Sequence, residues 1–302
     1  IDNEFNIIEG VIGNVNIPRG GLKLAERTRN VEFAGNLNAG GDITTQGSII
    51  NSETLYSDAG ATTFADATTA LTSLFNAGGT ALFTTGDIIT VTGATKGAAT
   101  LPDKTFEVGP ANTSGSDDFG TLIGDLMAFI DDILGIDDTV SGGVTITSGV
   151  VAIEGNTGGK NDLGLEDGHF ILNQATSPTL PLAFTKAQSA DGESVRTTFF
   201  VYDSLGNAAV VDLTVVLESK TNTGTTWRFY AQSEADTDLD RHLSNGVLTL
   251  DTDGQIITVT DGTITIDRAA TGAFTPQTVT LQFEEGKSVS ALADVQSQIS
   301  AV

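Results

Sequence analysis

The sequence predicts a mainly β protein with more than one domain. Glycine is frequent (35 residues), proline is rare (6 residues), and short apolar runs such as residues 87–92 and 143–147 alternate with turn residues. Runs of this length are typical of strands that have one buried face. The chain has 302 residues, and about 100–150 residues per domain implies two or three domains. We expect β-sandwich or flattened-barrel domains and one inserted α+β module.

Two helical patterns, with strands around them, predict the α+β module. Apolar residues recur at spacings of three and four over residues 117–135, which predicts a helix capped by Ser116 or Asp117 and ended by Gly135. A weaker pattern over residues 63–76 predicts a second helix. The strands of this module are expected at residues 88–91, 105–108 and 170–172.

A β-hairpin is predicted over residues 196–217. Apolar and polar residues alternate on both sides of a short polar segment, as in two paired strands. In that segment the carboxylate of Asp203 can accept bonds from backbone N–H groups, and Gly206 and Asn207 tolerate a positive φ. The pattern of strand and turn continues to residue 283, and about eight such strands suit a sandwich or flattened barrel.

The hairpin and the strand that follows it resemble the bacterial flagellar hook protein family. The resemblance lies in VYDSLGNA at residues 201–208, followed by an alternating apolar strand and a tryptophan strand. Residues 30–38, 153–165 and 245–256 are similar to other segments of hook subunits, in the family's order, although Leu250 stands where an aromatic residue is more usual. The signature residues of the hairpin, to which we give a structural role, are Tyr202, Asp203, Ser204, Gly206, Asn207 and Trp227.

The resemblance implies that the domains are nested. Pro178 and Pro181 lie in a polar stretch, which we interpret as a crossover between domains. The expected domains are a partial inner β domain (residues 1–45 and 284–302), an outer β domain (residues 46–57 and 176–283) and the inserted α+β domain (residues 58–175).

The same resemblance implies a structural subunit that polymerises into the hook, a universal joint between motor and filament. It implies an extracellular location, export by the flagellar type III apparatus without a cleaved signal peptide, and contacts with the hook cap, the distal rod and the hook–filament junction proteins. The chain shows no terminal heptad repeats, so we interpret it as a central fragment that stays monomeric without the axial helices.

Composition excludes several other functions. Lys and Arg number 14 against 39 Asp and Glu, which gives a net charge of −25. Such a charge repels phosphate backbones and anionic lipids, so nucleic acid and membranes are not expected partners. The chain has no cysteine, which excludes disulfides and thiolate chemistry. We find neither a signal-peptide pattern nor an apolar run long enough to span a bilayer.

The sequence does not predict an enzyme. His169 and His242 lack the motifs that accompany a catalytic or metal-bound histidine, and we expect both at the surface or in turns. The carboxylate pairs at residues 131–132, 137–138 and 284–285 are adjacent in sequence, whereas glycosidases need two carboxyl groups that face each other. The Gly-rich stretches lack a phosphate-binding pattern. We therefore expect no catalytic, cofactor-binding or metal-binding residue.

Two alternatives to a hook subunit remain at this stage. The first is a related axial protein of the distal rod or the hook cap. The second is a calcium-dependent surface adhesin, because residues 236–240 and 251–254 place carboxylates at alternating positions. Neither segment completes an EF-hand loop. Finally, alternation along residues 227–230 places Trp227 and Phe229 on one strand face, which we expect to be buried, with Tyr230 on the other.

Overall fold

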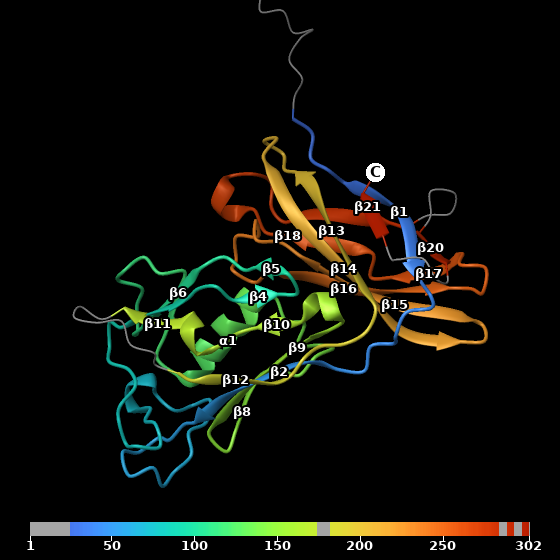
Figure 1. Cartoon of the computed structure of the whole chain (residues 1–302). Helices are drawn as coiled ribbons and strands as arrows, with labels where there is room; N and C mark the ends of the chain where they lie inside the picture. Colours follow the sequence, from blue (N-terminus) through green and yellow to red (C-terminus); the bar gives the residue numbers. More distant parts are fainter. Residues whose placement is uncertain (1–24, 174–181, 284–288, 293–297, 302) are drawn as a thin grey trace, which may run out of the picture.

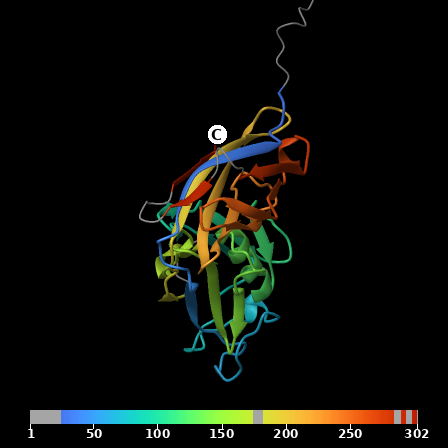
Figure 2. The ribbon, with the colours of Figure 1, turned by 90° about the vertical axis from the view of Figure 1, so that its right-hand side faces the viewer.

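The computed structural model describes residues 25–173, 182–283, 289–292 and 298–301. They form five β-sheets and one α-helix (Figure 1), so the predicted mainly β fold is confirmed. The sheets surround two hydrophobic cores. We call the parts around these cores the sandwich unit (residues 25–38, 194–283, 289–292 and 298–301) and the helix unit (residues 47–173 and 182–188). Figure 2 shows the sandwich unit stacked above the helix unit.

The sandwich unit consists of two sheets that share one core. Its five-stranded antiparallel sheet runs in the order β13-β14-β15-β16-β17, and the second sheet has the order β18-β19-β1-β20, with β21 also paired to β1. Phe33 of the second sheet stacks on Phe283 and meets Phe199 of the first edge to face, with ring centroids 4.9 and 5.2 Å apart. The strands are β1 (Asn30–Asn38), β13 (Ser194–Tyr202), β14 (Ala208–Thr221), β15 (Gly224–Gln232), β16 (His242–Leu250), β17 (Ile256–Thr260), β18 (Thr263–Ile266), β19 (Gln277–Gln282), β20 (Val289–Leu292) and β21 (Gln298–Ala301).

The helix unit packs one α-helix, α1 (Ile123–Leu134), among three smaller sheets. The sheets have the orders β12-β2-β9-β8, β11-β3-β6-β7 and β10-β4-β5. Their strands are β2 (Gly47–Thr54), β3 (Ile88–Val91), β4 (Thr95–Lys96), β5 (Ala99–Thr100), β6 (Lys104–Val108), β7 (Asp118–Gly120), β8 (Gly143–Thr147), β9 (Val150–Thr157), β10 (Leu163–Gly164), β11 (Phe170–Asn173) and β12 (Phe184–Gln188). Short 3₁₀ turns occupy Leu71–Ser73, Gly159–Asn161 and Asp167–His169 in this unit, and Ala269–Thr271 forms one in the sandwich unit.

The predicted helices have different outcomes. The helix over residues 117–135 exists and ends at Gly135, which has φ 58°, but its start was predicted too early. Asp118–Gly120 is strand β7, parallel to β6, and the carboxylate of Asp125 accepts the N–H groups of Thr121 and Leu122 at 2.8 and 2.9 Å. The prediction of a helix over residues 63–76 was wrong, because this segment contains only the 3₁₀ turn at Leu71–Ser73.

The nested domain boundaries remain a prediction. Strand β2, which we assigned to the outer domain, pairs with β9 and β12 and contributes Ile50 to the core of the helix unit. The proposed crossover at Pro178 and Pro181 lies outside the described residues.

Candidate functional site: the signature hairpin and the junction of the two units

The turn of the signature hairpin is organised by Asp203. Its side chain is fully buried, and its Oδ1 accepts the N–H groups of Leu205 and Asn207, each at 2.9 Å. Gly206 has φ 86°, a conformation that costs other residues energy. Asp203 and Gly206 therefore have the local roles expected of them in a turn, whereas Asn207 does not adopt a positive φ.

A distant arginine completes this turn. Arg268 donates from Nη2 to Asp203 Oδ2 at 3.2 Å, and its side chain is only 7% exposed. A second nitrogen, Nη1, donates to the carbonyl of Ala235 at 2.6 Å. The hydroxyl of Ser204 accepts the N–H of Phe274 at 2.8 Å. The sequence did not reveal Arg268 as a partner, because 65 residues separate it from Asp203.

The remaining signature residues occupy two different environments. Trp227 is fully buried in the core of the sandwich unit, where its Nε1 donates to Thr225 Oγ1 at 3.0 Å. Tyr202 is 49% exposed, and its carbonyl accepts the N–H of Thr28 at 2.8 Å. Trp227 and Phe229 are buried as expected, but Tyr230 on the opposite face is fully buried too.

Tyr230 is buried because the helix unit covers part of the outer face of the β13–β17 sheet. Its hydroxyl lies 3.2 Å from Thr157 Oγ1 of the helix unit. Val216 and Thr214 lie on the same outer face and are buried as well. The two units therefore meet over a packed surface.

The centre of the junction is the C-terminal end of α1. The side chain of Lys96 is fully buried and its Nζ donates to the carbonyls of Leu134 and Gly135, both at 2.9 Å. Burial lowers the pKa of Lys96 well below its usual value, and the nearby charge of Arg196 lowers it further. From the sandwich unit, Gln232 Nε2 also donates to the Gly135 carbonyl, at 2.6 Å. The amine and amide donors at this helix C-terminus satisfy carbonyls that lack partners within the helix.

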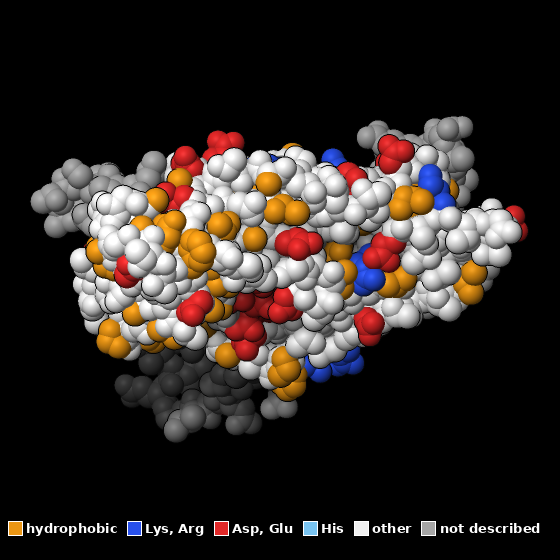
Figure 3. All heavy atoms as spheres, turned by 90° about the horizontal axis from the view of Figure 1, so that it is seen from below, with side chains coloured by type: hydrophobic (Ala, Val, Ile, Leu, Met, Phe, Trp, Pro, Cys, Tyr) orange, Lys and Arg blue, Asp and Glu red, His pale blue; other side chains and the backbone are white. Residues whose placement is uncertain are grey.

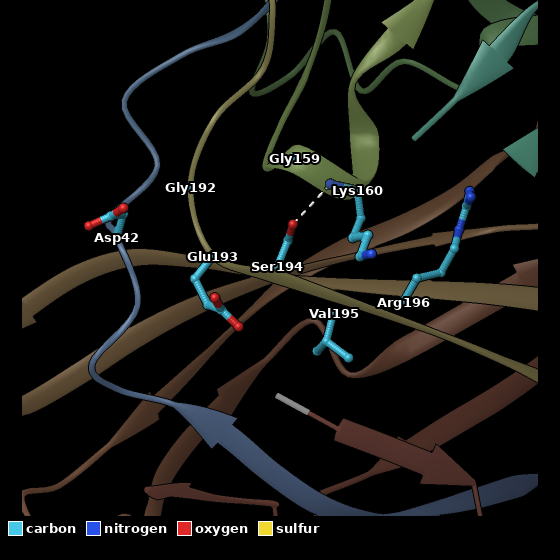
Figure 4. A pocket seen from close by; sticks show the side chains of 8 residues that line it. All are labelled: Asp42, Gly159, Lys160, Gly192, Glu193, Ser194, Val195 and Arg196. Carbon is cyan, nitrogen blue, oxygen red and sulfur yellow. Dashed lines mark hydrogen bonds between the residues drawn. The ribbon is translucent and has the colours of Figure 1, made fainter. Parts of the chain in front are cut away.

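Two linkers, residues 39–46 and 189–193, connect the units and are bonded to each other. The carboxylate of Asp191 accepts the N–H groups of Thr45 and Gln46 at 2.7 and 3.1 Å, and the N–H of Glu193 donates to the Asp42 carbonyl at 2.8 Å. Next to them is a hollow of about 630 Å³. Figure 4 shows Asp42 and Glu193 on one side of it and Lys160 and Arg196 on the other, with the N–H of Lys160 bonded to Ser194.

Carboxylates gather where α1 meets the loop before β16. Burial, together with the charges of Asp138 and Asp240, raises the pKa of Asp131 to about 6. Burial, together with the charges of Asp240 and Asp131, raises the pKa of Asp132 to about 7. Burial and an interaction with Asp238 likewise raise the pKa of Asp236 to about 7. Figure 3 shows acidic side chains together on the underside of the molecule, where basic side chains are fewer.

These groups do not form a recognisable catalytic or metal centre. His169 Nδ1 accepts the N–H of Glu166 in a turn at 3.0 Å, whereas His242 is partly buried and lies 3.7 Å from Asp137 Oδ2. Asp251 accepts the N–H groups of Asp253 and Gln255 within its own turn. Among the residues with described positions, no three His, Cys, Asp or Glu side chains are grouped so that they could hold a metal ion. No helix in the described ranges is both long and apolar enough to cross a membrane.

Comparison with known proteins identifies a domain in the second half of the chain. Residues 171–301 match the family model described as the flagellar basal body protein FlaE D2 domain. Residues 171–301 therefore form a domain of the flagellar hook protein family. The matched segment includes every strand of the β13–β17 sheet, and hence the signature hairpin and the tryptophan strand.

Two solved structures of hook proteins are also similar to this chain. A flagellar hook protein of Helicobacter pylori, FlgE2, is 12% identical with a TM-score of 0.30, and the alignment covers 91% of this chain and 59% of that chain. A 32 kDa fragment of the flagellar hook protein FlgE from Caulobacter crescentus is 13% identical with a TM-score of 0.36, covering 91% of this chain and 100% of the fragment. No curated protein matches the chain. The assignment to the family therefore rests on the domain model and holds for residues 171–301.

Proposed function

We propose that this chain is the central part of a structural subunit of the bacterial flagellar hook. The observation that carries the proposal is the match of residues 171–301 to the D2 domain model. In the proposed role, full-length subunits assemble with copies of themselves outside the cell, after export without a cleaved signal peptide. The ends of the polymer would contact the distal rod, the hook cap and the hook–filament junction proteins.

The proposed mechanism is that of a universal joint, in which each subunit is a stiff spacer and bending occurs between subunits. Two packed cores and a hydrogen-bonded junction support stiffness within the subunit. Contacts between neighbouring outer domains would then slide as the hook rotates, which requires interfaces that are modest and separable. The net charge of −25 should make these contacts depend on ionic strength.

Deletion and localisation test this function. Removing the gene from the bacterium that makes this protein should abolish hooks and swimming motility, and an epitope-tagged copy should restore both. Gold-labelled antibody against the tag should decorate the hook along its length. Label restricted to the distal rod or to the hook tip would instead assign the chain to a related axial protein. Intact hooks in the deletion strain would refute a hook role.

A calcium-dependent adhesin is the alternative from another class. It predicts that a chelator lowers the melting temperature of the purified chain substantially, because bound calcium would stabilise the folded state. Calorimetry with and without the chelator separates the two functions. A hook subunit should melt at nearly the same temperature in both conditions.

A further inference from the structure

Exposed apolar side chains gather on the signature hairpin. Phe200 and Tyr202 lie two residues apart on β13, and Val210 on β14 is paired directly with Phe200. Their exposed fractions are 59%, 49% and 41%. Leu205 in the turn and Phe274, whose N–H is bonded to the serine of that turn, are each 57% exposed. We call these five residues the hairpin patch.

The hairpin patch concentrates apolar surface in one place. Among the described residues, eleven large apolar side chains are exposed, and five of them belong to the patch. Contiguous exposed apolar surface on a soluble protein often marks an interaction site. Aromatic side chains are also enriched among the residues that contribute most to binding energy at protein interfaces.

A hollow beside the patch offers space for side chains of a partner. It measures about 410 Å³ and lies between β13 and the segment that leads into β1. Phe200 and Tyr202 line it on one side, and Thr28 and Asn30 line it on the other. A partner residue inserted there would contact the edges of both sheets of the sandwich unit.

The strand residues of the hairpin patch lie on the outer face of the β13–β17 sheet, and the helix unit covers another part of that face. On the outer face of the β13–β17 sheet, Val216 and Tyr230 are fully buried beneath the helix unit. Val210 and Phe200 lie further along the same face and remain exposed. The interface within the chain and the hairpin patch are therefore two regions of one sheet face, separated by the polar side chains of Thr198 and Asp212, and only the first region is covered.

The charges near the patch favour an acidic partner. The guanidinium of Arg27 lies 4.3 Å from the centre of the Phe274 ring. Arg268 is buried and its charge is opposed by Asp203. The chain carries a net charge of −25 and shows an acidic underside (Figure 3), so another copy presents abundant carboxylates to Arg27. Charge complementarity of this kind orients partners and suppresses wrong ones.

We propose that the hairpin patch is a contact surface for a second copy of this chain. The patch would bury its aromatic side chains against apolar surface of the neighbour, and Arg27 would meet a carboxylate at the rim. This inference rests on the proposed function, because it assumes that the subunit assembles with copies of itself.

Cysteine labelling tests the proposal, since these 302 residues contain no cysteine. Leu205→Cys is placed in the full-length subunit, and Ile257→Cys, at a β17 position that is 59% exposed outside the patch, is the matched control. The rate of reaction with a maleimide is measured in free subunits and in isolated hooks. Assembly should slow the reaction at position 205 several-fold more than at position 257. Equal rates in hooks and free subunits at position 205, or equal slowing at both positions, would overturn the proposal.

Cross-linking identifies the protein that contacts the hairpin patch. A benzophenone maleimide attached to Leu205→Cys should, in hooks, form a product that mass spectrometry identifies as two copies of this chain. A product with a different protein would overturn the choice of partner. If the wild-type chain is absent from hooks, the proposed function fails. If it is present and position 205 stays reactive, only the assignment of the patch fails.

The substitution Phe200→Ser tests how much the hairpin patch contributes to the free energy of assembly. Phe200→Ser should weaken assembly of full-length subunits by about tenfold, because burial of a phenyl group contributes roughly that factor. Ile257→Ser, which removes an equally exposed side chain elsewhere, should assemble like the wild type. Both variants should unfold at the wild-type urea concentration when fluorescence of the buried Trp227 is followed. Unchanged assembly of Phe200→Ser would contradict the proposal.

Discussion

Arg268→Met is expected to destabilise the sandwich unit substantially. The substitution removes the buried ion pair with Asp203 and the bond from Arg268 to the carbonyl of Ala235. Removing one partner of a buried pair typically costs about 3–5 kcal/mol, because the other charge stays buried without compensation. Asp203 keeps the bonds from Leu205 and Asn207. We therefore expect a loss near the lower limit, about 3 kcal/mol.

Urea denaturation followed by tryptophan fluorescence measures this loss. Trp227 is the only tryptophan in the chain and lies in the core of the same unit, so its emission reports the unfolding of that unit. Arg29→Met is the matched control, since Arg29 lies 3.7 Å from Glu26 in an exposed pair. Exposed pairs contribute about 0–1 kcal/mol, so the control should unfold close to the wild-type midpoint.

The double variant Arg268→Met/Asp203→Asn sharpens this test. It should be more stable than expected from the sum of the two single variants, because the second change removes the uncompensated charge left by the first. An Arg268→Met midpoint equal to that of Arg29→Met would refute the reasoning. Strictly additive effects in the double variant would refute the explanation by an unpaired buried charge.

Three further predictions concern the junction and the turn. Lys96→Met should lower the free energy of unfolding by about 1–3 kcal/mol, seen as a lower urea midpoint, because the buried carbonyls of the last turn of α1 lose the Lys96 amine as a hydrogen-bond donor. Stability should fall as pH rises from about 4 to about 7, because the pKa of Asp132 near 7 exceeds its unfolded value of about 3.9. Protons stabilise the folded state in that window, and Asp132→Asn should flatten the dependence measured by urea titrations at each pH. Gly206→Ala should cost about 1–2 kcal/mol because of its positive φ, whereas Gly168→Ala, with open space around it, should leave the urea midpoint nearly unchanged.

The features that the sequence predicted correctly depend mainly on local patterns. The alternation on either side of Asp203 defines β13 and β14, and their register follows from the turn between them. Gly135 marks the end of α1 for a local reason as well, because it adopts a left-handed conformation at the helix terminus. Motifs of a few residues therefore carried both the fold class and the family resemblance.

The features that the sequence did not predict depend on tertiary contacts or on competing local bonds. Asp118–Gly120 has a helical apolar pattern but forms a strand, since β6 offers it a parallel partner. In the segment predicted as a second helix, Asp66 bonds to the N–H of Thr68 at 2.9 Å, and such bonds compete with helix formation. Lys96 lies 38 residues from the helix end that it caps, a distance at which single-sequence patterns carry no signal.

Electron cryomicroscopy of hooks from the bacterium that makes this protein tests the central claim most directly. The account predicts that every subunit repeat of the tube contains a β-sandwich into which the β13–β17 sheet fits, with the hairpin patch facing another subunit. A hook whose repeats lack this sandwich, in cells that express the protein, would contradict the account.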